Sequence, residues 1–318
     1  MIDIGYTLSS EEFGPNQLIE HAVLAEEAGF SFALISDHYH PWIDQQGHSP
    51  FVWGVIGGVA RATSHLRLGT GVTCPTVRIH PAIVAQAAAT AGCLMPGRFF
   101  LGVGSGENLN EHIVGRYWPA VDVRLEMLEE AVQVIRLLWE GGLKSHRGRH
   151  FEVVNARVYD LPEASVHIYM AGAGKRSATI AASIADGYIG TGPDAEVLQV
   201  FEETGGADKP RYGQVTVCWA KDKESARRTA KEWWPNKAIQ GELGQELPLP
   251  RHFEQAAGMV EERELDEAMP IGPDPQEYIE AVQSYTAAGY DHVYFHQVGP
   301  DQAGFIHFCE QEVLPKIG

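Results

Sequence analysis

Short apolar runs recur along the chain, and most of them are bordered by Gly, Pro or Asp. Runs of this kind are typical of strands that are buried on both faces, as in a parallel sheet. The pattern predicts eight strands, at Ile2–Thr7, Phe32–Ile35, Leu66–Gly69, Arg98–Val103, Val166–Met170, Gly187–Gly190, Gln214–Ala220 and His292–His296.

Segments with a helical period lie between these runs. Pro15–Ala28 begins with proline and is followed by Gly29, which are the residues favoured at a helix start and just past a helix end. Arg124–Glu140 and Ser225–Trp234 place apolar residues at helical spacing, as a helix with one buried face requires. Most predicted strands are therefore followed by a predicted helix.

This alternation predicts an α/β fold of the (β/α)8 TIM barrel type, with residues 1–318 forming a single domain. A doubly wound open sheet is the alternative, and nothing in the spacing favours it. Two stretches interrupt the alternation and are interpreted as insertions, at about 144–163 and 235–272. The first of them is expected to be irregular or a hairpin.

The composition is ordinary for a soluble globular protein, with 44% hydrophobic and 21% charged residues. No run approaches the roughly 18 apolar residues of a membrane span. The start of the chain lacks the basic and apolar regions of a secretory signal, so we expect a cytoplasmic protein. The four cysteines form no C-x-x-C pair, which argues against a disulfide framework or a zinc knuckle.

Charge narrows the range of partners. Asp and Glu number 42 against 24 Lys and Arg, which gives a net charge of −18. Such an excess argues against nucleic acid or an anionic membrane as partner. An anionic cofactor could still bind, through backbone N–H groups and a few cations gathered at one place.

Residues 35–42, ISDHYHPW, follow the predicted strand Phe32–Ile35 and bring a carboxylate, two imidazoles and an indole to its carboxyl end. In parallel α/β folds this end carries the chemistry. His38, His40 and His48 raise the possibility of a metal site, which would need further ligands at later strand ends. Those ends carry glycine, alanine and threonine instead, so we expect no metal.

Three turns rich in small residues follow other predicted strands. Residues 104–107, GSGE, allow the close approach of a flat or phosphorylated ligand, although their spacing is not that of the dinucleotide fingerprint. Residues 68–76 are small and rich in hydroxyl groups, and can lie against a ring system. Residues 170–177 open a helix with two cations, as a phosphate site does. Ordinary turns or solvated surface explain each of these segments when it is taken alone.

Taken together, these segments resemble the luciferase-like flavin and deazaflavin oxidoreductases, most closely the group that contains F420-dependent glucose-6-phosphate dehydrogenase. The resemblance covers nearly the whole chain. Its carriers are 36–38 (SDH) with 41–42 (PW), 69–72 (GTGV), 104–107 (GSGE) with 110–111 (NE), and 186–187 (DG). The family implies a (β/α)8 barrel, usually a homodimer, with coenzyme F420 in its mouth. It also implies a cis peptide after the third strand, here Gly71–Val72.

The resemblance also implies residue roles. His38 matches the base that takes the hydroxyl proton as a hydride leaves the carbinol carbon for C5 of F420, and an unperturbed histidine pKa of about 6.5 suits that task. Glu107 matches the acid that serves the ring nitrogen of the reduced cofactor. Trp42 is implied beside the reacting atoms, and His252 as a second active-site histidine. The positions implied to hold the cofactor are Asp37, Gly71, Val72, Thr73, Ser105, Gly106, Asn110, Gly172, Gly174 and Thr191.

The chain departs from the sugar-phosphate enzymes where three cations grip the substrate phosphate, since it has Asp194, Arg251 and Ala268 there. A phosphate would lose charge-assisted hydrogen bonds of roughly 1.5–3 kcal/mol each and meet a carboxylate. We therefore expect an F420-dependent oxidoreductase that acts on an uncharged alcohol or ketone. The alternatives are a sugar-phosphate dehydrogenase, an FMN-dependent monooxygenase of the same superfamily, and a non-catalytic flavin-binding relative. The presence of both His38 and Glu107 argues against the last.

Overall fold

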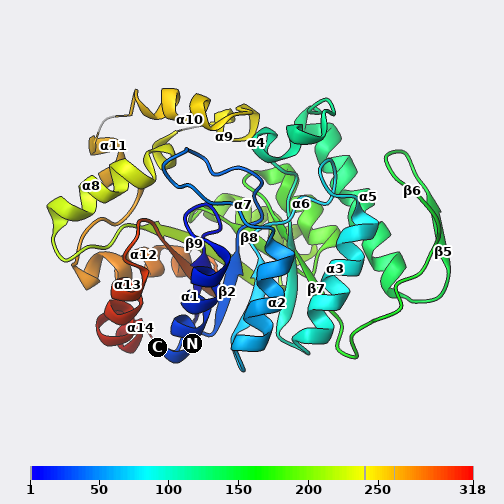
Figure 1. The fold of residues 1–318 in the computed structure, drawn as a ribbon, viewed down its shortest axis with the longest axis horizontal. Coiled ribbons are helices and arrows are strands. Elements are labelled where there is room, and N and C mark those ends of the chain that lie inside the picture. The colour runs from blue at the N-terminus through cyan, green and yellow to red at the C-terminus, as the bar shows by residue number, and fades with distance from the viewer. Residues whose placement is uncertain (1, 240, 261, 318) are drawn as a thin grey trace.

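A closed barrel of parallel strands forms the centre of the computed structural model, which describes residues 2–239, 241–260 and 262–317 (Figure 1). The strand order is β1-β10-β9-β8-β7-β4-β3-β2, so that the first and last strands pair and close the barrel. The predicted (β/α)8 barrel is confirmed. Its strands are β1 (Asp3–Leu8), β2 (Phe32–Ile35), β3 (Arg67–Thr70), β4 (Phe99–Val103), β7 (His167–Ala171), β8 (Gly187–Gly190), β9 (Arg211–Val217) and β10 (His292–Gln297).

The observed strands lie close to the predicted runs, and the largest difference concerns β9. This strand begins at Arg211 and ends at Val217, whereas the apolar pattern predicts Gln214–Ala220. At Cys218 the backbone N–H donates to the carbonyl of Pro270, so the chain leaves the barrel sheet there to pair with another segment. The local pattern does not reveal this end because Cys218 remains fully buried.

Aromatic side chains fill the inside of the barrel. Phe32, Phe100, Tyr169, Tyr212 and Tyr294 form one buried cluster with their aliphatic neighbours. The bulk of Phe100 requires glycine at its partner position on the neighbouring strand β3: a Cβ atom at position 69 would lie 1.9 Å from the Phe100 ring. The interior is therefore a packed core that supports the residues at the strand ends.

Helices surround the barrel and pack on the main hydrophobic core, as Figure 1 shows. The predicted helices at 15–28, 124–140 and 225–234 are present as α1, α5 and α8. The outer elements are α1 (Pro15–Glu27), α2 (Val52–Ala62), α3 (Pro81–Leu94), α5 (Val121–Trp139), α6 (Lys175–Ile184), α7 (Ala195–Phe201), η2 (Glu202–Gly206), α12 (Pro275–Ala288), α13 (Gln302–Phe308), η4 (Cys309–Val313) and α14 (Leu314–Ile317).

Two segments depart from the alternation. Between α5 and β7, strands β5 (Lys144–Arg147) and β6 (Glu152–Ala156) form an antiparallel hairpin that stands beside the barrel (Figure 1). Between β9 and α12, several short helices lie across the upper end of the molecule in the same view. These helices are α8 (Lys223–Trp233), η3 (Pro235–Ala238), α9 (Leu243–Glu246), α10 (Pro250–Ala257) and α11 (Glu262–Ala268). That the chain is a single domain stays a prediction.

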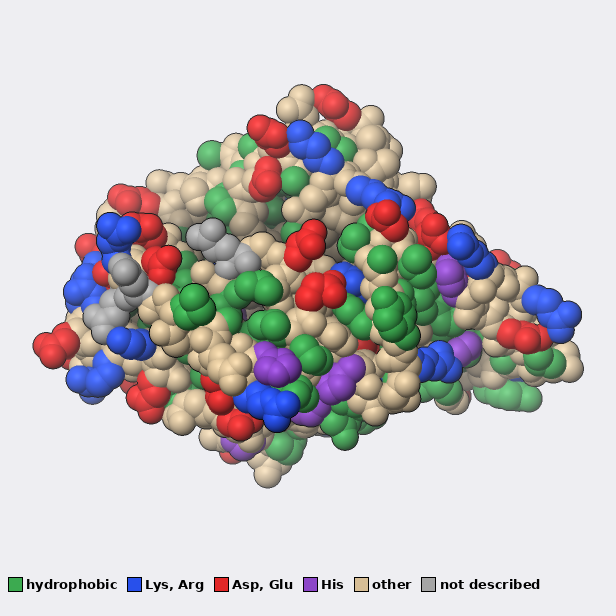
Figure 2. Space-filling view, turned by 90° about the horizontal axis from the view of Figure 1, so that it is seen from above, with side chains coloured by type: hydrophobic (Ala, Val, Ile, Leu, Met, Phe, Trp, Pro, Cys, Tyr) green, Lys and Arg blue, Asp and Glu red, His purple; other side chains and the backbone are tan. Residues whose placement is uncertain are grey.

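Helices of the described ranges are all too short or too polar to cross a membrane. Figure 2 looks onto the end of the molecule that the short helices cover. On this face Lys and Arg side chains are interspersed with Asp and Glu side chains. The arrangement gives no broad positive field on the face that is drawn, as the net charge of −18 leads one to expect.

Candidate active site

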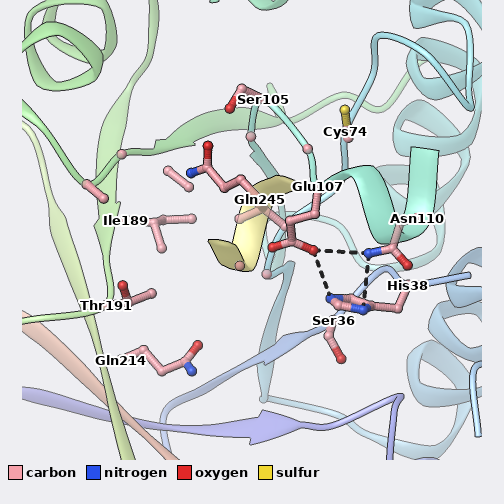
Figure 3. A pocket seen from close by; sticks show the side chains of 18 of the residues that line it. Ser36, His38, Cys74, Ser105, Glu107, Asn110, Ile189, Thr191, Gln214 and Gln245 are labelled. Atoms are coloured by element: carbon pink, nitrogen blue, oxygen red, sulfur yellow. Dashed lines mark hydrogen bonds and ion pairs between the residues drawn. The ribbon is translucent and has the colours of Figure 1, made fainter. Parts of the chain in front are cut away.

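A cavity of about 950 Å³ opens at the carboxyl ends of the barrel strands, and its walls include residues of η3 and α10. Its volume falls in the range of small-molecule sites, and barrel enzymes carry their active sites at this end. Figure 3 shows side chains from distant parts of the sequence around one space, with His38 and Glu107 on one side and Thr191 and Gln214 on another.

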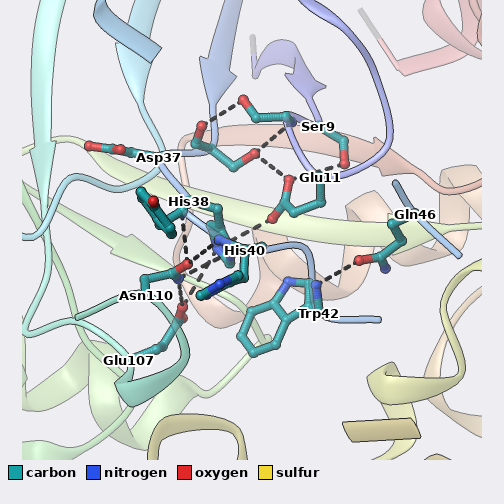
Figure 4. Close-up of polar contacts among 12 residues, drawn as sticks. Ser9, Glu11, Asp37, His38, His40, Trp42, Gln46, Glu107 and Asn110 are labelled. Atoms are coloured by element: carbon teal, nitrogen blue, oxygen red, sulfur yellow. Dashed lines mark hydrogen bonds and ion pairs between the residues drawn. The ribbon is translucent and has the colours of Figure 1, made fainter. Parts of the chain in front are cut away.

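His38 lies at the centre of a polar cluster in this cavity (Figure 4). Its Nε2 is 3.3 Å from Oε1 of Glu11 and 3.6 Å from Oε2 of Glu107. Its Nδ1 is 3.2 Å from the backbone oxygen of His40, to which the Nδ1–H can donate. When the neutral ring carries its proton on Nδ1, Nε2 is its basic nitrogen and faces the two carboxylates.

Asn110 on α4 (Asn108–Glu111) fixes the geometry of this cluster. Its Oδ1 accepts hydrogen bonds from the backbone N–H groups of Tyr39, at 2.9 Å, and His40, at 3.2 Å. Because the amide oxygen is used in this way, Nδ2 is directed to Oε2 of Glu107, at 3.0 Å, and lies 3.2 Å from Nδ1 of His38. One buried amide thus holds the loop after β2 against Glu107.

The charges around His38 shift its protonation. Burial lowers the pKa of His38, but the charges of Glu11 and Glu107 raise it by more, and the net shift is upward. Burial raises the pKa of Glu11, but the charge of His38 and a hydrogen bond from Ser36 lower it by more, and the net shift is downward. Burial raises the pKa of Glu107, and the charge of His38 offsets only part of this effect. Glu11 is therefore the stable anion of the pair, and Glu107 is the carboxylate that is easier to protonate.

Trp42 forms a wall of the cavity next to the base. Its ring centroid is 5.1 Å from that of His38 and 5.1 Å from that of Phe253 on α10. The backbone N–H of Trp42 donates to Gln46 at 2.8 Å, which holds the loop after β2 in place (Figure 4). The side chain reaches the cavity where the resemblance implies it.

Asp37 lines the same cavity and belongs to a buried ionic network. Its carboxylate accepts hydrogen bonds from Thr73, at 2.8 Å, and from the guanidinium of Arg78, at 2.8 Å. Arg78 also pairs with Glu111. Burial raises the pKa of Glu111 to about 7. Thr73 is fully buried beneath this network, so it supports Asp37 from behind and is not among the residues that line the cavity.

The glycine-rich turns form the rest of the cavity wall. The peptide Gly71–Val72 is cis, as the resemblance implies. Gly106 has φ of 82°, and a Cβ atom there would lie 2.6 Å from the sulfur of Cys74. Both the backbone conformation and the close contact require glycine at this position. Gly172, Gly174 and Thr191 also line the cavity.

Helix α6 starts at the cavity edge with two cations. Gly174 is its N-cap residue, and the guanidinium of Arg176 lines the cavity while it pairs with Asp122. Lys175 pairs with Glu196 at 3.0 Å. The first N–H groups of a helix and a nearby cation are a common setting for an anionic group.

Besides Thr73, three predicted site residues are absent from the set that lines the cavity. His252 and Arg251 lie on α10, where Phe253, which is 1% exposed, is the residue directed inward. Adjacent helical residues point roughly 100° apart, so Phe253 and its neighbours cannot all face the cavity. Asp194 instead caps α7, where its carboxylate accepts from the N–H of Val197 at 3.1 Å. The roles implied for these residues stay predictions.

The cavity is also lined by polar residues that the sequence analysis did not single out, among them Glu11, Gln214, Lys237 and His296. Glu11 follows β1 and His296 is the last residue but one of β10, so their place near a strand end was a usable signal. Lys237 lies in η3, within the long insertion, and its approach to the cavity depends on the path of that insertion. Across the described parts of the chain, no group of three or more His, Cys, Asp and Glu side chains is placed to hold a metal ion.

Comparisons with known proteins place the chain in a family. The model for luciferase-like monooxygenases matches residues 1–292. The F420-dependent glucose-6-phosphate dehydrogenase of Segniliparus rotundus is 35% identical, over 99% of this chain and 98% of the relative. The enzyme of the same name from Mycolicibacterium smegmatis is also 35% identical, with the same coverage.

A solved structure matches the fold over its full length. The F420-dependent secondary alcohol dehydrogenase in complex with an F420-acetone adduct has a TM-score of 0.92 and 28% sequence identity, and the match covers 100% of this chain and 99% of that chain. The family model, the sequence relatives and the barrel agree: the chain belongs to the luciferase-like family.

Proposed function

We propose that this protein is an F420-dependent oxidoreductase that transfers a hydride between an alcohol or ketone and C5 of F420. The observation that carries the proposal is the position of His38, whose Nε2 faces Glu11 and Glu107 in the cavity of a luciferase-like barrel. Relatives named as F420-dependent dehydrogenases, by sequence and by structure, support the choice of cofactor over FMN.

The cavity residues fit a ring system that carries an anionic tail. A Cβ atom at Gly174 would meet no protein atom within 4 Å, so this part of the wall is open to a ligand. Arg176 and the N-terminus of α6 would hold the anionic tail there. Val72, Ile189 and the glycines of residues 104–106 would lie against the ring.

When bound, F420 would supply the carbon that accepts the hydride from the substrate. Nε2 of His38 would accept the proton of the substrate hydroxyl in the tautomer whose Nδ1–H donates to the carbonyl of His40. The anionic carboxylate of Glu11 would then stabilise the imidazolium. Glu107, whose pKa burial raises, would hold a proton for the cofactor side of the site. Trp42 would exclude water from the base.

The charges in the cavity support an uncharged substrate. Glu11 and Glu107 stand beside the base, and a third carboxylate, Glu242, lines the cavity. In the described ranges the lysine and arginine side chains that line it are Arg176, already paired with Asp122, and Lys237. A phosphate dianion near His38 would meet the repelling charge of Glu11. We infer that the substrate is not a sugar phosphate, although the sequence relatives bear that name.

The proposal is tested with purified protein and F420. Secondary alcohols such as 2-propanol and cyclohexanol are compared with glucose 6-phosphate, and the loss of oxidised-deazaflavin absorbance is followed. We expect at least one alcohol to reduce F420 much faster than glucose 6-phosphate does. A comparable or faster rate with glucose 6-phosphate would assign the sugar-phosphate activity to this chain instead.

A further inference from the structure

Helix α9 of the long insertion forms part of the cavity wall, and side chains of α4 and α5 hold it there. Nδ2 of Asn108, the residue after Glu107, donates to the backbone oxygen of Glu246 at 2.9 Å. The guanidinium of Arg124 on α5 donates to Oε1 of Glu246 at 3.1 Å and to Oε1 of Gln245 at 2.8 Å. Gln245 lines the cavity (Figure 3), and the proposed mechanism gives it no role.

Arg124 is a firm support for α9, because its own side chain is enclosed. It is 1% exposed, and its guanidinium lies 4.3 Å from the ring centroid of Trp118. The same group donates to the backbone oxygen of Pro119 at 2.8 Å. A buried guanidinium has lost its hydration and depends on acceptors that the protein supplies. Since two of these acceptors belong to α9, the helix is tied to α5.

The bond from Arg124 settles how the amide of Gln245 is oriented. A guanidinium only donates hydrogen bonds, so the amide atom at 2.8 Å is the oxygen, and the NH2 group is the free end. Within residues 2–239, 241–260 and 262–317, this NH2 group has no hydrogen-bond partner. Because the amide oxygen accepts from a charged group, the amide is polarised and its NH2 group becomes a stronger donor. Gln245 therefore brings an unused donor to the cavity wall.

Contacts at the start of α5 show which part of the cavity this donor serves. Arg124, which holds Gln245, is the fourth residue of α5. Asp122, two residues earlier, pairs with Arg176 in the first turn of α6. Helices α9 and α6 thus meet the same end of α5, while the other contact of α9 is to the residue after Glu107. Gln245 therefore lies between the proposed reacting end of the cavity and the proposed site of the anionic tail.

A hydroxyl group is the ligand group that suits this donor. An NH2 group needs an acceptor, and a hydroxyl oxygen can accept from it while its own proton is donated elsewhere. A phosphate suits the position less well, because Glu242, the N-cap residue of α9, also lines the cavity and would repel it. In F420 the chain that joins the ring to the phosphate is a polyol, so it carries hydroxyl groups at this place.

We propose that Gln245 is a cofactor-binding residue, which donates a hydrogen bond to a hydroxyl group of the chain between the ring of F420 and its phosphate. This inference rests on the proposed function. It assigns part of the affinity for the cofactor to the long insertion, in addition to the glycine-rich turns of the barrel.

The experiment uses three ligands with the same deazaflavin ring. They are F420, an analogue that ends at the polyol chain and lacks the phosphate, and an analogue with a methyl group in place of the chain. The Kd of each is measured by fluorescence titration without alcohol. Gln245→Glu keeps an acceptor for Arg124 but has no NH2 group, and Gln245→Leu removes the amide without adding charge. Gln311→Glu, at an exposed position of η4, is the control for the charge change.

We expect both Gln245 variants to raise the Kd of F420 and of the phosphate-free analogue by about three- to tenfold, the worth of one hydrogen bond. The Kd of the methyl analogue should stay the same, and Gln311→Glu should bind all three ligands as the wild type does. Equal losses for all three ligands would indicate a distorted site, and a loss for F420 alone would indicate a contact with the phosphate. Either result overturns the assignment, and so does unchanged binding.

The oxidation of alcohols is assayed in parallel, so that the two proposals can fail separately. If the wild type binds F420 but oxidises no alcohol, the proposed reaction is wrong, and the titrations still decide the role of Gln245. If the wild type binds no F420, both proposals are wrong.

Discussion

At the residue scale, the chemistry of the site depends on two carboxyl groups, those of Glu11 and Glu107, that lie beside the same nitrogen of His38. Glu11 is 4% exposed and receives hydrogen bonds from two serines, so it stays ionised next to the ring. A buried anion beside a histidine stabilises the imidazolium that forms when the ring accepts a proton. Glu107 lies on the other side of Nε2 and is the more readily protonated of the two. His38 therefore has an anionic neighbour, Glu11, and a more readily protonated one, Glu107.

The first residue-scale prediction concerns His38→Ala. Because Nε2 is the proposed base, this variant should lower kcat for alcohol oxidation by about 10²–10⁴-fold. The Kd of F420, measured by fluorescence titration, should change little in comparison. His307→Ala is the control, since this side chain is 73% exposed. Turnover of the His38→Ala variant at the wild-type rate would show that His38 is not the base.

The second residue-scale prediction concerns pH. Oxidation requires neutral His38, so the rate rises as pH increases through the pKa of that ring, which the carboxylates raise above its ordinary value. Glu11→Gln removes one of these charges, so the pKa of His38 should fall. The acidic limb of kcat/KM against pH then moves to lower pH. Glu20→Gln, on the exposed face of α1, should leave the limb in place. A shift to higher pH, or none, would contradict the assignment.

At the element scale, the loop after β1 contacts the segment after β10 where the barrel closes. Strands β1 and β10 pair in register from Asp3 with His292 onward. Beyond their ends, Oε1 of Glu12 accepts a hydrogen bond of 2.7 Å from the backbone N–H of Gly299. Burial raises the pKa of Glu12 from 4.5 to about 8. A titratable group therefore links the first and last elements.

This link makes the stability of the barrel depend on pH. Between the ordinary pKa of 4.5 and the folded-state value of about 8, the folded state binds more protons at Glu12 than the unfolded chain does. The contribution of this group to the free energy of unfolding therefore decreases as pH rises through this window. Glu12→Gln keeps an oxygen acceptor for Gly299 and cannot ionise.

We expect the urea midpoint of the wild type to fall relative to that of Glu12→Gln as pH is raised from about 5 to about 9. Denaturation curves at matched ionic strength, followed by tryptophan fluorescence, give the two midpoints at each pH. A difference between the two proteins that stays constant over the whole range would show that Glu12 does not titrate in this window.

At the scale of the whole molecule, the cavity exists only because the barrel brings most of its loops to one end. Residues that follow β1, β2, β3, β4, β7 and β8 line it together with η3 and α10 of the long insertion. A ligand that contacts so many elements binds the folded state alone and stabilises all of them. The homodimer implied by the family stays a prediction.

The whole-molecule prediction separates the two cofactors. F420 at a hundredfold excess over its Kd should add about 2.7 kcal/mol to the free energy of unfolding, which raises the melting temperature by several degrees. FMN at the same concentration should raise it less. Differential scanning fluorimetry with the dye signal corrected for cofactor absorbance measures both. A larger shift with FMN would favour the monooxygenase alternative.

The sequence was sufficient for the features that depend on local spacing. Apolar runs and helical periods located the strands and helices, because buried strands and amphipathic helices impose their own periodicity. The same reasoning located His38, Trp42 and Glu107, because each stands just beyond a strand that is itself recognisable. The end of β9 was missed, since it depends on pairing with a distant segment at Ile271.

The tertiary structure decided which strand ends meet and which side of the long insertion faces inward. Glu11 approaches His38 only because β1 and β2 pair side by side in the barrel. Lys237 reaches the cavity while Arg251 and His252 do not, because Phe253 packs against Ile43 and Leu109 and so sets the rotation of α10. Local patterns cannot encode such choices, since they follow from packing between segments that are far apart in the chain.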